Sequence, residues 1–123
     1  MTTNPNLLSK VSVIAIGVTD LAKSIEFYNR TLGLPSANRS EDIAFIATPT
    51  VTLLLSQPLG RFIAPATSSM EIVFSVESVS ASYRLLAERG CEFIKQPGQV
   101  SGDSWTATFK DPDGHLLTIF GGK

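Results

Sequence analysis

The sequence predicts an α+β fold built from two βαβββ units, and two observations support this prediction. First, a β-branched strand that leads into a capped helix and a stop glycine occurs twice along the 123 residues, at an offset of 58 residues. Second, a chain of this length suits one domain made of two half-size modules that share a core. We expect modules at about 10–56 and 70–121, joined by a linker at 57–69, within a single domain spanning 1–123.

The first unit opens with a strand and a helix. The β-branched run at 10–17 is typical of a strand. It leads into Thr19 and Asp20, either of which can cap a helix by accepting a backbone N–H bond. An apolar stripe at helical spacing then extends from Leu21 to Leu32, and Gly33 suits the left-handed position that ends a helix.

Strands and a linker complete the first half. A short segment near 34–40 is followed by a hairpin of 43–47 and 50–56, because Thr48-Pro49 separates two apolar runs. The stretch 57–69 contains Pro, Gly, Ser and Thr, so we expect it to break regular structure.

The second half repeats the pattern. A strand at 70–76 precedes Ser78, a suitable helix cap, and the helix that follows is expected to end at Gly90. Three further strands are predicted at 92–95, 104–110 and 116–120. The offset aligns four pairs of residues: Ile14 with Ile72, Ile16 with Phe74, Val18 with Val76, and Ser24 with Ser82.

Composition excludes several classes of protein. One His and one Cys cannot form a zinc site rich in those residues or an intrachain disulfide. A net charge of −1, without clusters of Lys and Arg, gives no electrostatic footprint for nucleic acid. The apolar runs are too short to span a bilayer, and the first ten residues lack the order of a signal peptide. We therefore expect no nucleic-acid or membrane partner and a cytoplasmic protein.

Two motifs carry a family resemblance. Residues 17–28 (GVTDLAKSIEFY), completed by Leu32-Gly33-Leu34, resemble the opening signature of the vicinal oxygen chelate superfamily, which includes glyoxalase I, bleomycin resistance proteins and extradiol dioxygenases. Residues 109–115 (FKDPDGH) resemble its closing strand and turn. The resemblance covers about 11–120. It implies two βαβββ modules that form a cup-shaped mixed sheet around a cavity, with the helices outside. Together with a charged fraction of only 17%, it also favours a homodimer.

The resemblance also identifies where a metal would bind in metal-dependent members. Four ligands, typically His, Glu or Gln, come from the first and last strands of each unit. The matching positions here hold Val13, Leu54, Glu71 and Thr118. Two aliphatic side chains donate nothing to a metal, so we expect no metal and no other cofactor. Whether the protein is an enzyme stays open, and Glu71 is its one catalytic candidate.

Period-2 counting along the strands predicts a largely apolar cavity with a few hydroxyls. The residues expected to bind a ligand there are Val13, Ala15, Thr52, Leu54, Ser56, Glu71, Val73, Thr118 and Phe120, with Trp105 beside a polar stretch at 96–104 that is long for a hairpin and suited to a rim. Each prediction has an alternative that involves no ligand. In these alternatives the cup is filled by its own side chains, Glu71 is simply solvated, and Trp105 packs into one end of the core.

The preferred function is metal-free binding of a small, partly apolar organic molecule in the cavity between modules. The alternative is a metal-dependent lyase, dioxygenase or epimerase of the same superfamily whose site is divergent or misaligned. An acid–base enzyme that uses Glu71 alone and a purely structural dimer are further possibilities. We expect His115, beside the turn at 111–114, to be structural or at the surface, and Cys91 to be a small buried side chain.

Overall fold

The computed structural model describes residues 11–62 and 70–123. The first half contains β1 (Val13–Gly17), α1 (Leu21–Glu26), the π-helical turn η1 (Phe27–Thr31), β2 (Asn38–Ser40), β3 (Ile43–Ala47), β4 (Thr52–Ser56) and α2 (Gln57–Phe62). The second half contains β5 (Glu71–Ser78), α3 (Val79–Glu88), β6 (Phe93–Ser101), β7 (Ser104–Lys110) and β8 (Leu116–Gly122). The predicted α+β class, with two βαβββ units, is confirmed.

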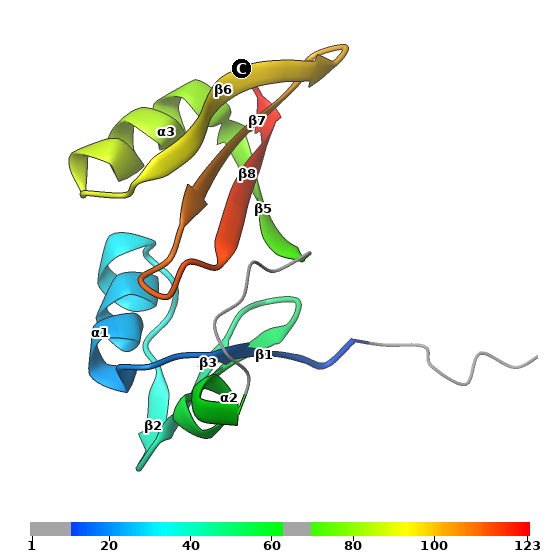
Figure 1. Ribbon diagram of the computed structural model, residues 1–123. Helices are drawn as coiled ribbons and strands as arrows, with labels where there is room; N and C mark the ends of the chain where they lie inside the picture. Colours follow the sequence, from blue (N-terminus) through cyan, green and yellow to red (C-terminus); the bar gives the residue numbers. More distant parts are fainter. Residues whose placement is uncertain (1–10, 63–69) are drawn as a thin grey trace, which may run out of the picture.

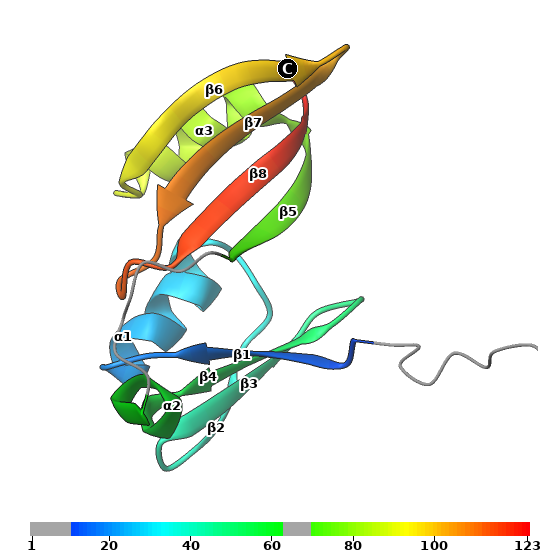
Figure 2. The same cartoon turned by 45° about the vertical axis from the view of Figure 1, so that its right-hand side comes forward.

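The strands form two four-stranded mixed sheets with equivalent topology. Their orders are β1-β4-β3-β2 and β5-β8-β7-β6. In each sheet the first strand pairs in parallel with the last one, and the other pairs are antiparallel. The two sheets lie one above the other, with α1 and α3 on the same side of the molecule (Figure 1). Figure 2 shows both sheets with these helices behind them.

Each sheet buries the face that its helix covers. Along β5 (EIVFSVES) exposed and half-buried residues alternate strictly, because successive side chains of a strand point to opposite faces. The buried core therefore lies between each sheet and its helix. Its largest fully buried side chains include Tyr28, Phe109, Leu21, Ile46, Leu53, Leu55 and Leu117. None of the helices in the described part of the chain has the length and apolar character needed to cross a membrane.

The helices begin where their caps predict. The Asp20 carboxylate accepts a hydrogen bond from the Lys23 amide at 3.1 Å, and the Ser78 hydroxyl accepts one from the Ala81 amide at 3.1 Å. α1 and α3 consequently start at the predicted offset of 58 residues. The first helix reaches Gly33 as predicted, but its second half widens into η1, and Gly33 has φ +80°.

Two segments differ from the sequence predictions. Residues 57–62, expected to be irregular, form α2. Pro58 lies in its first turn, where proline is tolerated, and the Ser56 hydroxyl accepts a hydrogen bond from the Leu59 amide at 3.1 Å. The rest of the predicted linker lies outside the described residues.

The second difference is the predicted rim at 96–104. β6 and β7 stay paired through Ser101 and Ser104, so most of this stretch is strand. β6 is an edge strand, where Pro97 removes no ladder bond, and register shifts accommodate it.

The two motifs that carry the family resemblance, at 17–28 and 109–115, contact each other and join the modules. The Tyr28 hydroxyl donates to Asp111 Oδ2 at 2.8 Å, and the backbone N–H and hydroxyl of Thr19 donate to Asp113 Oδ1 at 3.1 and 2.7 Å. His115 Nε2 lies 2.7 Å from the Gly17 carbonyl oxygen. We call this set of contacts the inter-module latch. The first motif thus has a structural function, because it forms hydrogen bonds with the turn that follows β7.

Candidate functional site

Each sheet has a second face, turned away from its helix, which we call the open face. On the N-terminal sheet it is mostly apolar. Val13 is opposite Thr52 in register, Ala15 is opposite Leu54, and Leu54 is also opposite Phe45. Val13 is 44% exposed and Phe45 is 39% exposed. These apolar side chains therefore line a surface that the described residues leave uncovered.

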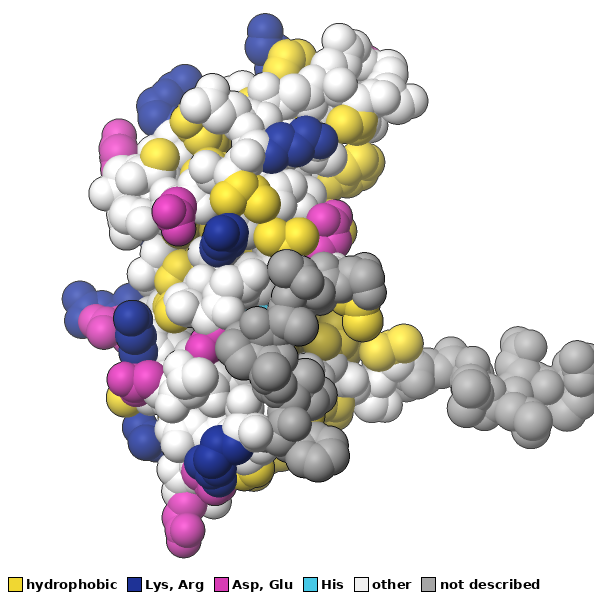
Figure 3. Space-filling view, in the orientation of Figure 1, with side chains coloured by type: hydrophobic (Ala, Val, Ile, Leu, Met, Phe, Trp, Pro, Cys, Tyr) yellow, Lys and Arg dark blue, Asp and Glu magenta, His cyan; other side chains and the backbone are white. Residues whose placement is uncertain are grey.

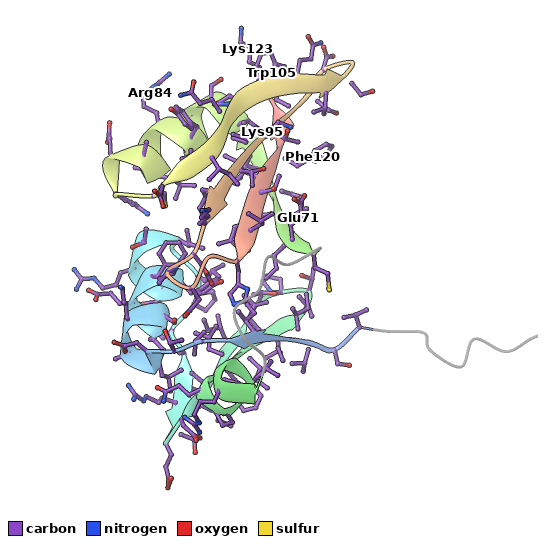
Figure 4. All side chains as sticks on the ribbon, viewed as in Figure 1. Glu71, Arg84, Lys95, Trp105, Phe120 and Lys123 are labelled. Carbon is purple, nitrogen blue, oxygen red and sulfur yellow. The ribbon has the colours of Figure 1, made fainter. Side chains whose placement is uncertain are left out.

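The open face of the C-terminal sheet combines apolar and hydrogen-bonding groups. Val73 is opposite Thr118 in register, and Thr118 is opposite Thr108. The two threonine hydroxyls are buried and lie 2.8 Å apart, so they satisfy each other. Around this pair, Val73 is 52% exposed and Phe120 is 40% exposed. Figure 4 shows Glu71 and Phe120 extending from the same side of the sheet.

A further hydroxyl on this face has no partner. Thr106 is opposite Phe120 in register and therefore lies on the open face. Its Oγ1 is buried and is the one buried side-chain oxygen or nitrogen without a hydrogen bond among the residues that the structure describes. Such a group costs about 1–3 kcal/mol of stability when nothing satisfies it. A polar atom is thus placed on this face at the expense of the fold.

The structure brings together most of the residues predicted to line the cavity, but in two groups. By register, the N-terminal open face holds Val13, Ala15, Thr52, Leu54 and Ser56, and the C-terminal open face holds Glu71, Val73, Thr118 and Phe120. Ser56 is buried, and its hydroxyl caps α2. The two groups lie on separate sheets, so a cavity that unites them stays a prediction.

Trp105 lies apart from both groups. It is opposite Gly121 in register, one position from Thr106, and therefore points to the helix-covered face. There it packs against the core, with the Lys123 ammonium 5.2 Å from the indole ring centre (Figure 4). The structure does not place its ring among the open-face residues.

Sequence reasoning missed several open-face residues. Thr106 and Thr108 of β7, and Phe45 of β3, share these faces with the predicted residues. Lys95 of the edge strand β6 is opposite Thr108. The signal was present for β7, because alternation along SWTATFK separates its threonines from the apolar Trp, Ala and Phe. For Lys95 the sequence carries no such signal, because a register shift in β6 precedes that residue and simple alternation no longer predicts its face.

The four positions that the family resemblance matches to metal ligands do not suit a metal here. Val13 and Leu54 offer no donor atom, and Glu71 and Thr118 provide one carboxylate and one neutral hydroxyl that is already bonded to Thr108. Within 11–62 and 70–123, no three His, Cys, Asp or Glu side chains are grouped so that they could hold an ion. These four side chains therefore provide no basis for metal chemistry.

His115 and Cys91 have structural surroundings. His115 is half-buried in the latch, and because a carbonyl oxygen only accepts, its Nε2 donates to the Gly17 carbonyl. Cys91 is buried as predicted, and this burial raises the pKa of its thiol. A raised pKa disfavours the reactive thiolate.

Comparison with known proteins places this fold in a family. The family model described as the Glyoxalase/Bleomycin resistance protein/Dioxygenase superfamily matches residues 10–119. The uncharacterized protein YraH of Bacillus subtilis is 27% identical over 124 residues, which cover 90% of this chain and 97% of that protein.

Solved structures agree on the fold. A glyoxalase-related enzyme from Fulvimarina pelagi superimposes with a TM-score of 0.80 at 22% identity, covering 94% of this chain and 89% of the other. TnmS3, an antibiotic binding protein from Streptomyces sp. CB03234, gives 0.73 at 21% identity, covering 97% and 100%. These identities bear on the fold alone. The family match spans most of the sequence, and the chain therefore belongs to the glyoxalase/bleomycin resistance protein/dioxygenase superfamily.

Proposed function

We propose that this protein binds a small, partly apolar organic molecule, without a metal or other cofactor, against the open face of its C-terminal sheet. The exposed side chains of Val73 and Phe120 provide an apolar surface, and Glu71 at the start of β5 provides a carboxylate for a cationic or hydrogen-bond-donating group. The antibiotic-binding description of TnmS3, which has this fold, supports the same class of function.

We also propose a cytoplasmic location, because the single, unpaired Cys91 suits a reducing compartment.

The observation that carries this proposal is the unpaired hydroxyl of Thr106. A valine would fill nearly the same space without an unsatisfied buried oxygen, so the fold alone does not explain a threonine here. A ligand that approaches Phe120, the cross-strand neighbour of Thr106, can supply the missing partner when the Phe120 ring moves aside.

The open face of the N-terminal sheet is part of the same proposal. It is apolar, and residues 11–62 and 70–123 leave exposed apolar side chains on both open faces. Figure 3 shows hydrophobic side chains on the side of the molecule away from α1 and α3. We propose that a second copy covers them, so that the N-terminal sheet of one chain faces the C-terminal sheet of the other. Each of the two resulting cavities would then have one apolar and one mixed wall.

Calorimetry with organic cations, aromatic antibiotics and thiol conjugates tests the binding proposal. Once a ligand is found, Thr106→Val should weaken its affinity about tenfold while leaving the unfolding midpoint unchanged or raised. A loss of affinity together with a gain of stability distinguishes a binding role from a structural one. Thr50→Val, at an exposed turn, is the control and should change neither quantity. Unchanged affinity in Thr106→Val contradicts the proposal.

Metal analysis separates this proposal from metal-dependent enzyme chemistry. Protein purified without chelator should contain far less than one equivalent of zinc, nickel, manganese or iron. Near-stoichiometric metal would support a lyase or dioxygenase instead, since it would require donors that Val13 and Leu54 do not provide.

Sedimentation velocity tests the second copy. We expect a dimer, and Phe45→Asp should shift it towards monomer because the aspartate would be buried against the other chain. Leu85→Asp on α3 is the matched control, because Leu85 is an apolar residue that is also partly exposed but lies away from the open faces. Wild-type protein that sediments as a monomer would contradict the dimer but not ligand binding.

A further inference from the structure

A cavity lies on the helix side of the molecule, where the two modules meet. Its volume is about 280 Å³. The N-terminal module contributes Leu32 and Leu34, which follow η1. The C-terminal module contributes Leu85 and Leu86 from α3, Arg89 just after that helix, and Phe74 from β5. None of the open-face residues predicted to bind a ligand belongs to this lining.

The walls of this cavity are apolar, and its polar groups are few. Leu85 is 47% exposed although it faces the cavity, so the apolar lining continues to the surface. Ser75 and Ser82 are its two serines, and Arg89 contributes the positive charge in the lining. An apolar cavity with a small number of oriented polar groups is the usual composition of a small-molecule site.

Arg89 is held in place by the opposite module. Its guanidinium donates to the Thr31 carbonyl oxygen at 2.8 Å, which ties the end of α3 to the end of η1 (Figure 1). One such bond leaves other N–H donors of the guanidinium fork available. A carboxylate is the group that fits this fork best, because it accepts charge-assisted hydrogen bonds in a matching geometry. The positioning is present before any ligand arrives, which lowers the entropic cost of binding.

We propose that this cavity binds a small amphipathic carboxylate, with its apolar body between Leu34 and Leu85 and its carboxylate on Arg89. The ligand would contact both modules and would therefore strengthen the contact between the end of α3 and the end of η1. The cavity lining contains none of the residues that the proposed function uses, so this proposal stands whether or not the binding function proposed above is correct.

Titration of isotope-labelled protein by NMR tests the site, with octanoate as the probe and octanol and octylammonium as charge controls. Octanoate should shift the amide signals of Leu34, Leu85 and Leu86. Arg89→Gln should weaken octanoate binding about tenfold and leave octanol binding nearly unchanged. Arg84→Gln is the matched control, since Arg84 lies on α3, the helix that Arg89 follows, is outside the cavity lining, and projects away from the sheet (Figure 4).

A second variant is needed because Arg89→Gln can also weaken the contact between the modules. Leu85→Glu places a like charge at the mouth, at an exposed position, and should abolish octanoate binding while the protein stays folded. Phe120→Ser, on the open face, should leave octanoate binding intact. The proposal is overturned if octylammonium binds as tightly as octanoate, or if Phe120→Ser rather than Arg89→Gln removes the octanoate shifts.

Discussion

The two modules share one topology but present different chemistry on their open faces. In the N-terminal module the paired positions along β1, β4 and β3 are mainly aliphatic or aromatic, as with Ala15, Leu54 and Phe45. In the C-terminal module the equivalent strands carry threonines, with Glu71 at the end. The two modules thus combine one backbone topology with different side chains on the open face. In the proposed dimer, one module would supply apolar contact and the other hydrogen bonds.

The turns before the last strand of each module differ in a second way. After β3, the Thr48 hydroxyl accepts a hydrogen bond from the Val51 amide at 3.0 Å, so this exposed turn is closed by its own side chain. After β7, the buried Asp111 accepts from the amides of Asp113 and His115 at 2.9 and 2.8 Å and from Tyr28. One turn is local, whereas the other also joins the modules.

This contrast gives the largest expected effect. Asp111→Ala should lower the free energy of unfolding by about 4 kcal/mol, because three hydrogen bonds to a buried carboxylate are lost and the Tyr28 hydroxyl keeps no partner. Thr48→Ala should cost about 1 kcal/mol. Urea unfolding measures both.

Asp111→Asn separates geometry from charge. It retains the Oδ1 acceptor for the two turn amides, so its loss should be about half that of the alanine variant. Equal losses for Asp111→Ala and Thr48→Ala would show that the turn after β7 does not join the modules energetically.

A close backbone approach is instead common to both modules. A Cβ atom at Gly60 would lie 2.3 Å from the Val18 carbonyl oxygen, and one at Gly121 would lie 1.9 Å from the Val76 carbonyl oxygen. Val18 and Val76 are aligned by the 58-residue repeat. Only glycine therefore fits at these two contacts with the end of each first strand.

We expect Gly60→Ala and Gly121→Ala each to destabilise the protein by about 3 kcal/mol, since backbone atoms must move. Gly98→Ala is the control, because its Cβ would meet nothing nearer than 3.9 Å. Thermal unfolding compares the three variants. A large effect at only one of the two glycines would break the equivalence of the modules.

Much of the fold was predictable because its signals are local. Caps at Asp20 and Ser78, and stop glycines at 33 and 90, depend on a few neighbouring residues. α2 and the extension of β6 were missed for different reasons. The signal for α2 is local, because Ser56 caps the helix and Pro58 lies in its first turn, but the same residues are also typical of a loop. The extension of β6 past Pro97 depends on its position at the sheet edge, which is set by partners that are distant in the sequence.

The candidate site was only partly predictable. Strand alternation places Val73 and Phe120 on one face, but it does not reveal which sheet faces which. Trp105 differs because it lies one position from an open-face residue, and a shift of one residue moves a side chain to the other face. The latch was not predicted, since nothing in either motif indicates that Tyr28 and Asp111 meet.

The smallest expected effect concerns one tyrosine in each module. Tyr28 is buried, and its desolvation, reinforced by the nearby charge of Asp111 and by their hydrogen bond, raises the pKa of the phenol far above its ordinary value of about 10. Tyr83 is half-buried and packs edge-on against Phe93 instead. Below pH 10 Tyr28 keeps its proton in both the folded and the unfolded state. Above pH 10 only the unfolded chain releases it, so the free energy of unfolding should fall by about 1.4 kcal/mol per pH unit.

Tyr28→Phe should be less stable at neutral pH but should lose this part of the decline above pH 10. Tyr83→Phe, the matched control in the other module, retains Tyr28 and should keep the decline. Urea unfolding at a series of pH values from neutral to alkaline measures the slopes. Parallel slopes in wild type and Tyr28→Phe would mean that the hydroxyl reaches water in the folded state. The latch would then be open where its hydrogen bond to Asp111 implies that it is closed.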